Sequence, residues 1–324
     1  MHYNDFGTWA RRRFPFRIQK ISVDAGFSCP NRDGRIALGG CTFCDNRSFN
    51  PSYLSAETDD SHGALTPQRI TSQLEAGKKF FARKYPDMKY LAYFQAFTNT
   101  YAPLDRLKPM YEQALSARDV VGIVIGTRPD CVSKELLLYL EQLSRHATVI
   151  VEYGIESAND ATLLRINRGH DFACSQRAVE ETAALGIITG GHVIVGLPGE
   201  SAEESLRQAS LISSLPLNIL KIHQLQIIKG TALAEEYLNS PFHLYSVDEY
   251  IHLISNYIQL LRKDIVLDRF TSQSPSHMLI APKWGMKNHE FADKLNNYLR
   301  QNNIFQGARH PDGAFTPQPA QGEK

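Results

Sequence analysis

The sequence predicts an α/β fold, a partial (βα)6 TIM-like barrel with parallel strands, followed by a small C-terminal α/β extension. The first observation behind this prediction is an alternation, repeated about six times, of short β-branched apolar runs with longer amphipathic stretches. The second is that polar or glycine-rich segments follow these runs, at the strand ends where parallel sheets bind ligands. Right-handed crossovers in that order curl such a sheet.

Each apolar run has the length of a strand, and each amphipathic stretch has the length of a helix. We expect strands at Arg17–Val23, Lys89–Phe94, Val120–Ile125, Thr148–Tyr153, Ile188–Val195 and Asn218–Gln224. We expect helices at Thr66–Lys84, Pro103–Ala117, Ser133–Arg145, Asn159–Ile166, Phe172–Leu185 and Ala202–Ser213. Ser133 suits an N-cap, and Gly186 suits the left-handed residue that often follows a helix.

The rhythm changes after about Ile227. Two helices are expected there, at Val247–Arg262 and Lys287–Asn302, with a strand-like segment at Ile265–Phe270 between them. We therefore divide the chain into an N-terminal segment (1–16), the partial barrel (17–226), the C-terminal extension (227–310) and a tail (311–324). The tail is predicted to be disordered because it lacks apolar periodicity.

Composition bounds the class of protein. The chain has 324 residues, of which 43% are hydrophobic, enough for one large α/β domain and an appendage. Its net charge of +1 gives no global signature of nucleic-acid binding, although Arg11-Arg12-Arg13 is a local basic patch. No apolar run reaches the length of a membrane span, and the first residues do not read as a signal peptide. The odd number of cysteines, five, fits a reducing cytoplasm, and the oligomeric state stays open.

Three cysteines lie close together near the N-terminus: eleven residues separate Cys29 from Cys41, and two separate Cys41 from Cys44. A close pair and one outlying thiolate can hold three corners of an iron–sulfur cube and leave the fourth iron open to a small molecule. Zinc is the alternative, but a closed zinc site needs a fourth ligand, and the sequence has no second Cys-x2-Cys pair. Cys131 and Cys174 stand alone and are expected to be small core or partly buried residues, not ligands.

Five loops are predicted to meet at one rim of the barrel, because each follows the carboxyl end of an expected strand. They are the cysteine loop after Val23, Gln95–Thr98, Thr127–Asp130, Gly154–Ser157 and Gly196–Glu200. The last loop is a glycine-rich turn whose exposed backbone edge can pair with an adenine ring. Such a turn is a weak signal by itself.

Charged and titratable side chains near this rim are candidates for ligand binding. Glu152 and Glu156 share one face of an expected strand, and carboxylates inside a barrel should meet cations or ligands. Arg168 can hold a ligand carboxylate with two hydrogen bonds, or form a surface ion pair with Glu156. His192 can point into the barrel, or be an ordinary core histidine whose hydrogen bonds are satisfied.

Taken together, these motifs resemble those of radical S-adenosylmethionine (SAM) enzymes of the YhcC/YtqA-like family. That family is related to the branch that contains the elongator catalytic subunit and coproporphyrinogen dehydrogenase. The resemblance extends from about Gln19 to about Gly230. The matched stretches are Gly26–Gly34, Gly39–Cys44, Tyr93–Thr100, Gly126–Cys131, Arg165–Asp171 and His192–Glu200.

The resemblance implies a [4Fe–4S] cluster on Cys29, Cys41 and Cys44, with the amino and carboxylate groups of SAM on the remaining iron. One electron from the cluster would cleave SAM into methionine and a 5′-deoxyadenosyl radical, which abstracts a substrate hydrogen. Phe43 matches the aromatic position that packs near adenine. The resemblance identifies no catalytic side chain, and it assigns the following residues to cofactor binding: Phe43, Gln95, Thr127, Glu152, Glu156, Arg168 and His192.

Two departures from the usual motifs of the superfamily stand out. The first gap between the cluster cysteines is much longer than the usual three residues, as in the subgroup. The usual Gly-Gly-Glu after the second strand reads Gln95-Ala96-Phe97, which leaves open how the SAM amino group is held.

The resemblance favours tRNA as the substrate, through remodelling of the wobble-uridine side chain. The segment Lys283–Lys287, with the neighbouring Arg269 and His277, mixes bases with an aromatic ring as an RNA contact can, but Trp284 and Met286 can instead seal the open edge of the barrel. A radical enzyme that acts on a protein or small metabolite is the alternative, and a non-catalytic zinc-stabilised binding module is a further one. Radical chemistry also requires an electron donor such as flavodoxin or ferredoxin.

Overall fold

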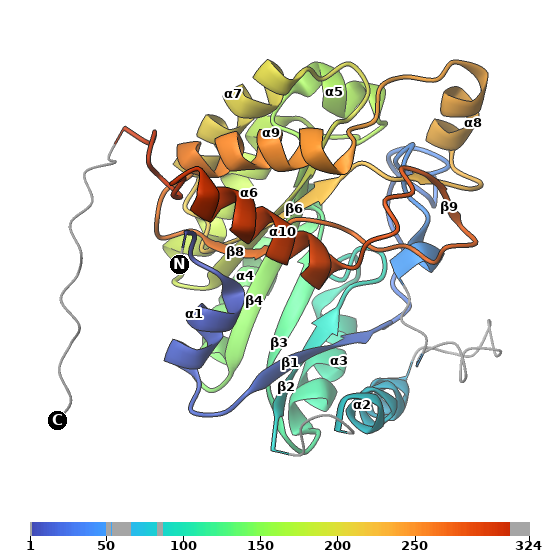
Figure 1. The fold of residues 1–324 in the computed structure, drawn as a ribbon. Helices are drawn as coiled ribbons and strands as arrows, with labels where there is room; N and C mark the ends of the chain where they lie inside the picture. Colours follow the sequence, from blue (N-terminus) through green and yellow to red (C-terminus); the bar gives the residue numbers. More distant parts are fainter. Residues whose placement is uncertain (1, 50–52, 54–65, 83–86, 312–324) are drawn as a thin grey trace, which may run out of the picture.

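A computed structural model describes residues 2–49, 53, 66–82 and 87–311. Seven parallel strands form the main sheet in the order β1-β2-β3-β4-β5-β6-β8, which curls into a half-barrel in Figure 1. The strands are β1 (Ile18–Val23), β2 (Lys89–Phe94), β3 (Val120–Thr127), β4 (Thr148–Glu156), β5 (Ile188–Val195), β6 (Ile219–Gln224) and β8 (Val266–Arg269). The expected α/β partial barrel is confirmed. Its first six strands are the six expected before residue 227, and the seventh, β8, comes from the C-terminal extension.

Ten α-helices lie in the described residues. They are α1 (Phe6–Arg13), α2 (Pro67–Ala82), α3 (Leu104–Ser116), α4 (Lys134–Ser144), α5 (Asp160–Arg165), α6 (Phe172–Ala184), α7 (Ala202–Ser214), α8 (Ala232–Asn239), α9 (Val247–Leu260) and α10 (Asn288–Gln301). The expected helices form with bounds within two residues of the prediction, although Lys84 lies outside the described residues. The sequence patterns did not predict α1 and α8.

Local capping explains several of these boundaries. The Ser133 hydroxyl accepts a hydrogen bond from the Leu136 backbone at 3.2 Å, which satisfies one free amide at the start of α4 as predicted. Gly186 follows α6 with φ of 72°, a left-handed conformation in which a Cβ atom would be strained. Ser246 and Glu249 form a reciprocal capping box at the start of α9.

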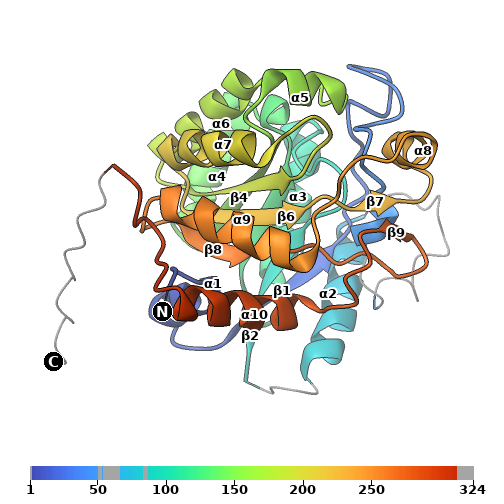
Figure 2. The ribbon, with the colours of Figure 1, turned by 45° about the horizontal axis from the view of Figure 1, so that its top comes forward.

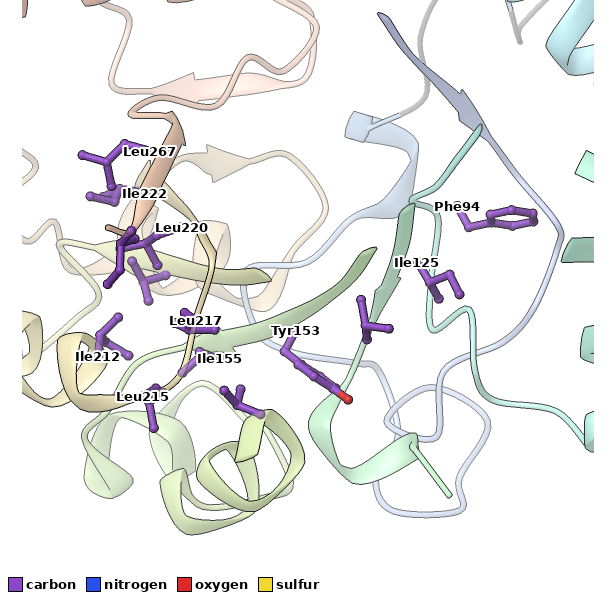
Figure 3. Packing of buried hydrophobic residues seen from close by; sticks show 14 of the residues in the cluster. Phe94, Ile125, Tyr153, Ile155, Ile212, Leu215, Leu217, Leu220, Ile222 and Leu267 are labelled. Carbon is purple, nitrogen blue, oxygen red and sulfur yellow. The ribbon is translucent and has the colours of Figure 1, made fainter. Parts of the chain in front are cut away.

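The two faces of the sheet have different surroundings. The outer face packs against the helices through a continuous apolar core, part of which Figure 3 shows around Phe94, Ile125 and Tyr153. On the same strands, alternate side chains point into the half-barrel, because successive residues of a strand face opposite sides. The inner face therefore carries the polar side chains of the site.

A smaller apolar cluster fills the inside of the half-barrel near the amino ends of the strands. It is formed by Leu91, Tyr93, Val124, Ile150, Ile219 and Val266. Phe6 and Trp9 of α1 pack against this cluster, so the N-terminal helix closes that end of the barrel. The opposite end, where the carboxyl ends of the strands lie, holds the pocket described below.

An ion pair joins the first strand to the last one across the interior. Lys20 of β1 contacts Asp268 of β8 at 2.6 Å, and it also contacts Glu152 of β4 at 3.2 Å. Strands at the two edges of the sheet order thus reach the same central space. This contact fits a curled sheet, since the first and last strands of a flat seven-stranded sheet would lie far apart.

The chain after residue 226 is tied closely to the barrel. Strand β8 belongs to the main sheet, while β7 (Ile227–Ile228) and β9 (Leu279–Ala281) form a separate antiparallel pair. Helix α9 packs on α7, and α10 packs on α9, as Figure 2 shows. The residues before α1 join this part, because the His2 ring stacks on Phe305 with a centroid separation of 4.6 Å.

Trp284 has a packing role. Its ring stacks on Phe291 at a centroid distance of 5.7 Å, and its Nε1 donates to the Tyr245 carbonyl at 3.0 Å. Both partners belong to the region around α9 and α10, so the indole helps to seal the helical layer, and the RNA contact stays a prediction. Apart from Pro311, the predicted tail lies outside the described residues. No helix among the described residues is long and apolar enough to cross a membrane.

Candidate active site

A pocket opens at the carboxyl ends of the strands, where the sequence places the rim. Four of the five predicted loops contribute to its wall, since the lining includes residues of the cysteine loop and of the loops after β2, β3 and β4. Six of the seven predicted cofactor-binding residues line it together with the three cluster cysteines. Glu152 does not line it, whereas Thr98 and Arg128 do. Residues 196–200 do not line it, although Ile194 does.

The three cysteines Cys29, Cys41 and Cys44 all line this one pocket. Cys41 is buried, and Cys29 and Cys44 are partly exposed. Burial, reinforced by the neighbouring Cys41, raises the pKa of the Cys44 thiol to about 12. A thiol with such a pKa is protonated at neutral pH, so thiolate ligation there depends on a bound cation.

Two guanidinium groups supply positive charge beside these sulfurs. Arg168 Nη1 donates to the Cys41 Sγ at 3.5 Å. Arg128 donates to Asp130 and, at 2.7 Å, to the Arg168 carbonyl. In the described part of the chain, Arg128 Nη1 and Arg168 Nε are buried without hydrogen-bond partners. Buried donors of this kind are costly unless a ligand accepts from them. The surroundings therefore suit an anionic cluster and a ligand carboxylate.

Asn31 fastens the cysteine loop to the segment that follows α5. The side chain is buried, and its Nδ2 donates to the Asn167 carbonyl at 2.5 Å and to the Arg168 carbonyl at 3.2 Å. The same nitrogen lies 3.6 Å from the Cys41 sulfur. From the other direction, Asn167 Nδ2 donates to the Gly40 carbonyl at 2.9 Å. These bonds fix Cys41 relative to Arg168.

Glu156 and Arg168 form a buried pair, not the surface pair considered from the sequence. Their closest charged atoms are 4.0 Å apart, with side chains 14% and 7% exposed, respectively. Burial raises the pKa of Glu156, and the nearby Arg168 opposes this effect. Gly154 makes room for the pair, because a Cβ atom there would lie 2.5 Å from Glu156 Oε1 and 2.9 Å from Arg168 Nη2.

Glu152 lies behind the pocket wall and does not line it. Its carboxylate is 1% exposed and contacts Lys221 at 2.5 Å, Lys20 at 3.2 Å and His192 at 3.0 Å. Burial by itself would raise the pKa of Glu152, but Lys20 and Lys221 hold it well below its ordinary value. The predicted cofactor contact of Glu152 is thus replaced in the structure by contacts to three side chains, and Glu152 orients His192.

His192 does point into the barrel and lines the pocket. Burial lowers the pKa of His192 to about 4, with Lys221 adding to the effect and Glu152 opposing it. His223 lies beside it, with ring centroids 5.4 Å apart, and burial also lowers the pKa of His223 well below its ordinary value. Both rings are neutral near pH 7, so each can donate and accept hydrogen bonds.

The remaining predicted contacts are also placed in the pocket wall. Gln95 accepts a hydrogen bond from the Ser22 hydroxyl at 3.1 Å, and the Thr127 hydroxyl bonds that of Thr100 at 2.5 Å. Phe43 is half-buried and packs against the apolar cluster that includes Leu163. Its ring therefore packs the cysteine loop against the apolar side of α5.

The Gly196–Glu200 loop lies beside the pocket. Gly196 has a positive φ of 90° and faces the Tyr245 ring. Glu200 accepts from the Ser157 hydroxyl at 2.6 Å and from the Gln208 amide at 2.7 Å. The acidic end of this loop thus braces the loop after β4, and the predicted pairing of its backbone with adenine stays a prediction.

A closed zinc site has no support in the described side chains. Within residues 2–49, 53, 66–82 and 87–311, no group of three or more His, Cys, Asp and Glu side chains could hold one metal ion. A cube distributes its cysteine ligands over different iron atoms, whereas four ligands of a zinc ion converge on one centre. Three thiols around one pocket fit the first arrangement.

Comparisons with known proteins decide the family. The model of the Radical SAM superfamily matches residues 31–208, and that of the Radical_SAM C-terminal domain matches residues 217–301. The chain belongs to the radical SAM superfamily. It is 35% identical over 305 residues to the uncharacterized protein YtqA of Bacillus subtilis (strain 168), covering 94% of this chain and 92% of YtqA. This radical SAM protein is therefore an enzyme of the YhcC/YtqA-like family, as the motifs predicted, and its cofactors are a [4Fe–4S] cluster and SAM.

More distant relatives share part of the chain or the fold. The tRNA uridine(34) acetyltransferase of Methanocaldococcus infernus is 25% identical over 188 residues, which cover 57% of this chain and 34% of that protein. The solved structure of the archaeal Methanocaldococcus infernus Elp3, with an N-terminal deletion, has a TM-score of 0.65 at 18% identity. It covers 89% of this chain and 64% of that chain, and it shows a shared fold.

Sequence reasoning missed four residues that shape this radical SAM site. Asn31 and Arg128 lie inside matched motifs. Their positions in the sequence, close to Cys29 and Thr127, could have identified them as site residues. Lys221 interrupts an otherwise apolar run on a central strand, which also signals a buried charge. Arg269 was grouped with a possible RNA contact, and nothing in the sequence shows that it lines the pocket.

Proposed function

We propose that this enzyme reductively cleaves SAM at its cluster to generate a 5′-deoxyadenosyl radical, and that the radical abstracts hydrogen from tRNA to modify the wobble-uridine side chain. The observation that carries the proposal is the grouping of Cys29, Cys41 and Cys44 in one pocket beside the guanidiniums of Arg128 and Arg168. When bound, the cluster supplies one electron to the sulfonium of SAM, and a C–S bond breaks.

The side chains of the chain bind and orient the reactants. The three cysteines are the proposed cluster ligands, and Arg168 is placed to hold the SAM carboxylate with its free Nε. The neutral imidazole of His192 can bond a ribose hydroxyl, because Glu152 holds its ring in place. Phe43 offers an apolar surface for adenine. Enclosing these groups excludes water from a reactive radical.

Support for a tRNA substrate comes from relatives. The tRNA uridine(34) acetyltransferase of Methanocaldococcus infernus is similar to more than half of this chain, and the fold is shared with an archaeal Elp3. We extend to this chain only the nucleic-acid substrate, at the uridine position that the relative's name gives. A flavodoxin or ferredoxin is the proposed electron donor.

The chemistry is tested by reconstituting the full chain with iron and sulfide without air, reducing it and measuring 5′-deoxyadenosine. The wild-type protein should form it, and Cys41→Ser should lose at least about 100-fold of this activity because one cluster iron loses its thiolate. Cys174→Ser is the matched control, since Cys174 is partly buried on α6 and does not line the pocket. Full activity in Cys41→Ser would refute the ligand assignment.

The substrate is tested separately, by comparing modified nucleosides in tRNA from a deletion strain and its parent. A uridine modification at the wobble position should be missing from the deletion strain and restored by the wild-type gene. Restoration should fail with the gene for Cys41→Ser. An unchanged nucleoside profile together with normal SAM cleavage would instead point to a protein or small metabolite as the substrate.

A further inference from the structure

One part of the pocket wall is built by segments far from the cysteine loop in the sequence. It comes from the end of β6 and the chain just after it, and from the end of β8 with the loop that follows. These segments line the pocket with Gln224, Gln226, Arg269, Ser272 and Ser274. Neither the cluster ligands nor the proposed SAM contacts include any of these residues.

A bulge in β8 turns Arg269 into the pocket. Leu220 of β6 pairs with Leu267, but the next residue, Lys221, pairs with Arg269, so Asp268 is the extra residue. Because paired residues of neighbouring strands point to the same face, Arg269 shares the inward face of Lys221. Regular alternation after Leu267 would have sent Arg269 outward, towards the helices. Bulges of this kind commonly redirect a side chain at a functional site.

The guanidinium of Arg269 has no counter-ion within the part of the chain that the structure describes. The nearby carboxylates are engaged elsewhere, because Asp268 contacts Lys20 at 2.6 Å and Glu152 contacts Lys221 at 2.5 Å. Among the described residues, Arg269 takes part in no ion pair, and its Nε is buried without a hydrogen-bond partner. A buried donor nitrogen of a charged group costs free energy when no acceptor faces it.

The charges of this interior do not cancel. Lys20 and Lys221 balance Glu152 and Asp268, which leaves the positive charge of Arg269 in excess. Arg269 acts electrostatically on His192, His223 and Tyr93, all of which are neutral at pH 7 because burial moves their pKa values away from it. The field in this part of the pocket therefore favours an anion.

The loop after Arg269 is held rigidly. The Gln224 amide donates to the Ser272 carbonyl at 3.1 Å and accepts from the Ser272 backbone amide at 2.7 Å. Gln226 donates to the same carbonyl at 3.2 Å and accepts from the Ser274 hydroxyl at 2.7 Å. None of these bonds uses the Ser272 hydroxyl, and Ser272 lines the same pocket as Arg269, so its hydroxyl is available as a second donor. A fixed pair of donors can bind an anion without reorganising.

We propose that Arg269 and Ser272 form a subsite for an anionic group of the substrate, a phosphate or a carboxylate. The inference rests on the proposed function, since a second anion site is needed only if a substrate enters the pocket together with SAM. Arg168 contacts the cluster cysteine Cys41 and serves the SAM carboxylate, whereas Arg269 lies beside His192 and His223. The pocket thus offers separate cations to cofactor and substrate.

The test measures anion binding to the reconstituted full chain with saturating SAM present, so that the Arg168 end is filled. Inorganic phosphate and acetate are titrated in separate calorimetric experiments, and the tighter of the two identifies the anion class. Arg269→Gln should weaken that binding by about tenfold or more, because charge-assisted hydrogen bonds are lost. Ser272→Ala should weaken it by roughly threefold, since one neutral hydrogen bond is lost.

Arg145→Gln is the matched control, because Arg145 is exposed at the end of α4 and its loss removes the same charge. It should keep the wild-type affinity. The proposal is overturned if the wild-type chain binds neither anion once SAM is present, or if Arg269→Gln binds as tightly as the wild type. Ser272→Ala retains the guanidinium, so it tests the subsite independently if the arginine variant fails to fold. The binding experiment requires no turnover, so its result can be interpreted even if the tRNA comparison shows no change.

Discussion

His192 and His223 lie next to each other in the pocket, and cationic side chains lie near both. Lys221 and Arg269 disfavour a further positive charge on either ring, and burial disfavours it more strongly. Glu152 attracts a proton to both rings but does not outweigh these effects. The neutral state is thus imposed on each residue by its surroundings, and it has a measurable consequence for stability.

The folded chain should lose stability as the pH falls below about 6.5, because the unfolded chain takes up a proton on His223 and the folded chain does not. At pH 7.5, His223→Gln should be less stable than the wild type through lost packing. This deficit should shrink by about 2 kcal/mol at pH 5, since one proton contributes about 1.4 kcal/mol per pH unit. Urea unfolding at the two pH values measures it, and a constant deficit would contradict the proposed burial of a neutral ring.

Four strands of the sheet share one network of ion pairs. Lys20 comes from β1, Glu152 from β4, Lys221 from β6 and Asp268 from β8. Tyr93 of β2 joins them by accepting a hydrogen bond from Lys221 at 3.0 Å. The network lies between the smaller apolar cluster around Leu91 and Val124 and the pocket, and its Glu152 orients His192.

Lys221→Met should lower the free energy of unfolding by roughly 3 kcal/mol, because it leaves two carboxylates facing a single lysine in a buried space. The double variant Lys221→Met with Glu152→Gln restores the balance of charge, with Lys20 and Asp268 left as a pair. Its loss in free energy of unfolding should therefore be about 1–3 kcal/mol smaller than the sum of the losses in the two single variants. Urea unfolding of the four proteins gives this coupling, and strictly additive effects would show that the ion pairs act independently.

The N-terminal residues cover one end of the half-barrel and contact the C-terminal part of the chain. Helix α1 covers the interior at the amino ends of the strands, Leu267 donates its backbone amide to the Asn4 carbonyl at 2.7 Å, and Gln306 donates to the His2 carbonyl at 2.9 Å. The predicted N-terminal segment and C-terminal extension thus contact each other and the barrel. The division of the chain at residues 16 and 226 stays a prediction about domains.

Trp9→Ala should lower the free energy of unfolding by about 2 kcal/mol, less than for a fully buried tryptophan because the ring is only partly covered. Arg12→Ala on the exposed face of the same helix is the control and should change it by less than about 0.5 kcal/mol. Chemical unfolding followed by circular dichroism measures both. Equal effects would mean that α1 does not close the barrel.

The sequence by itself determined the order of strands and helices, because periodicity of apolar residues and helix caps are local signals. It also determined the cysteine spacing, which favours an iron–sulfur cluster over zinc, and the motifs whose resemblance to radical SAM enzymes implied the cofactors. Phe43, Gln95, Thr127, Glu156, Arg168 and His192 line one pocket because strand ends of a parallel sheet meet at one rim, and their contacts to the cofactors stay predictions.

Tertiary structure alone decided which of these charges found partners. Glu152 left the pocket wall because Lys20 and Lys221, distant in sequence, converge on it inside the curled sheet. Arg269 entered the wall because one extra residue in β8 reversed its direction, and a bulge leaves no mark in the alternation of residue types. Long-range electrostatics and register depend on the closed shape of the sheet, which no local pattern encodes.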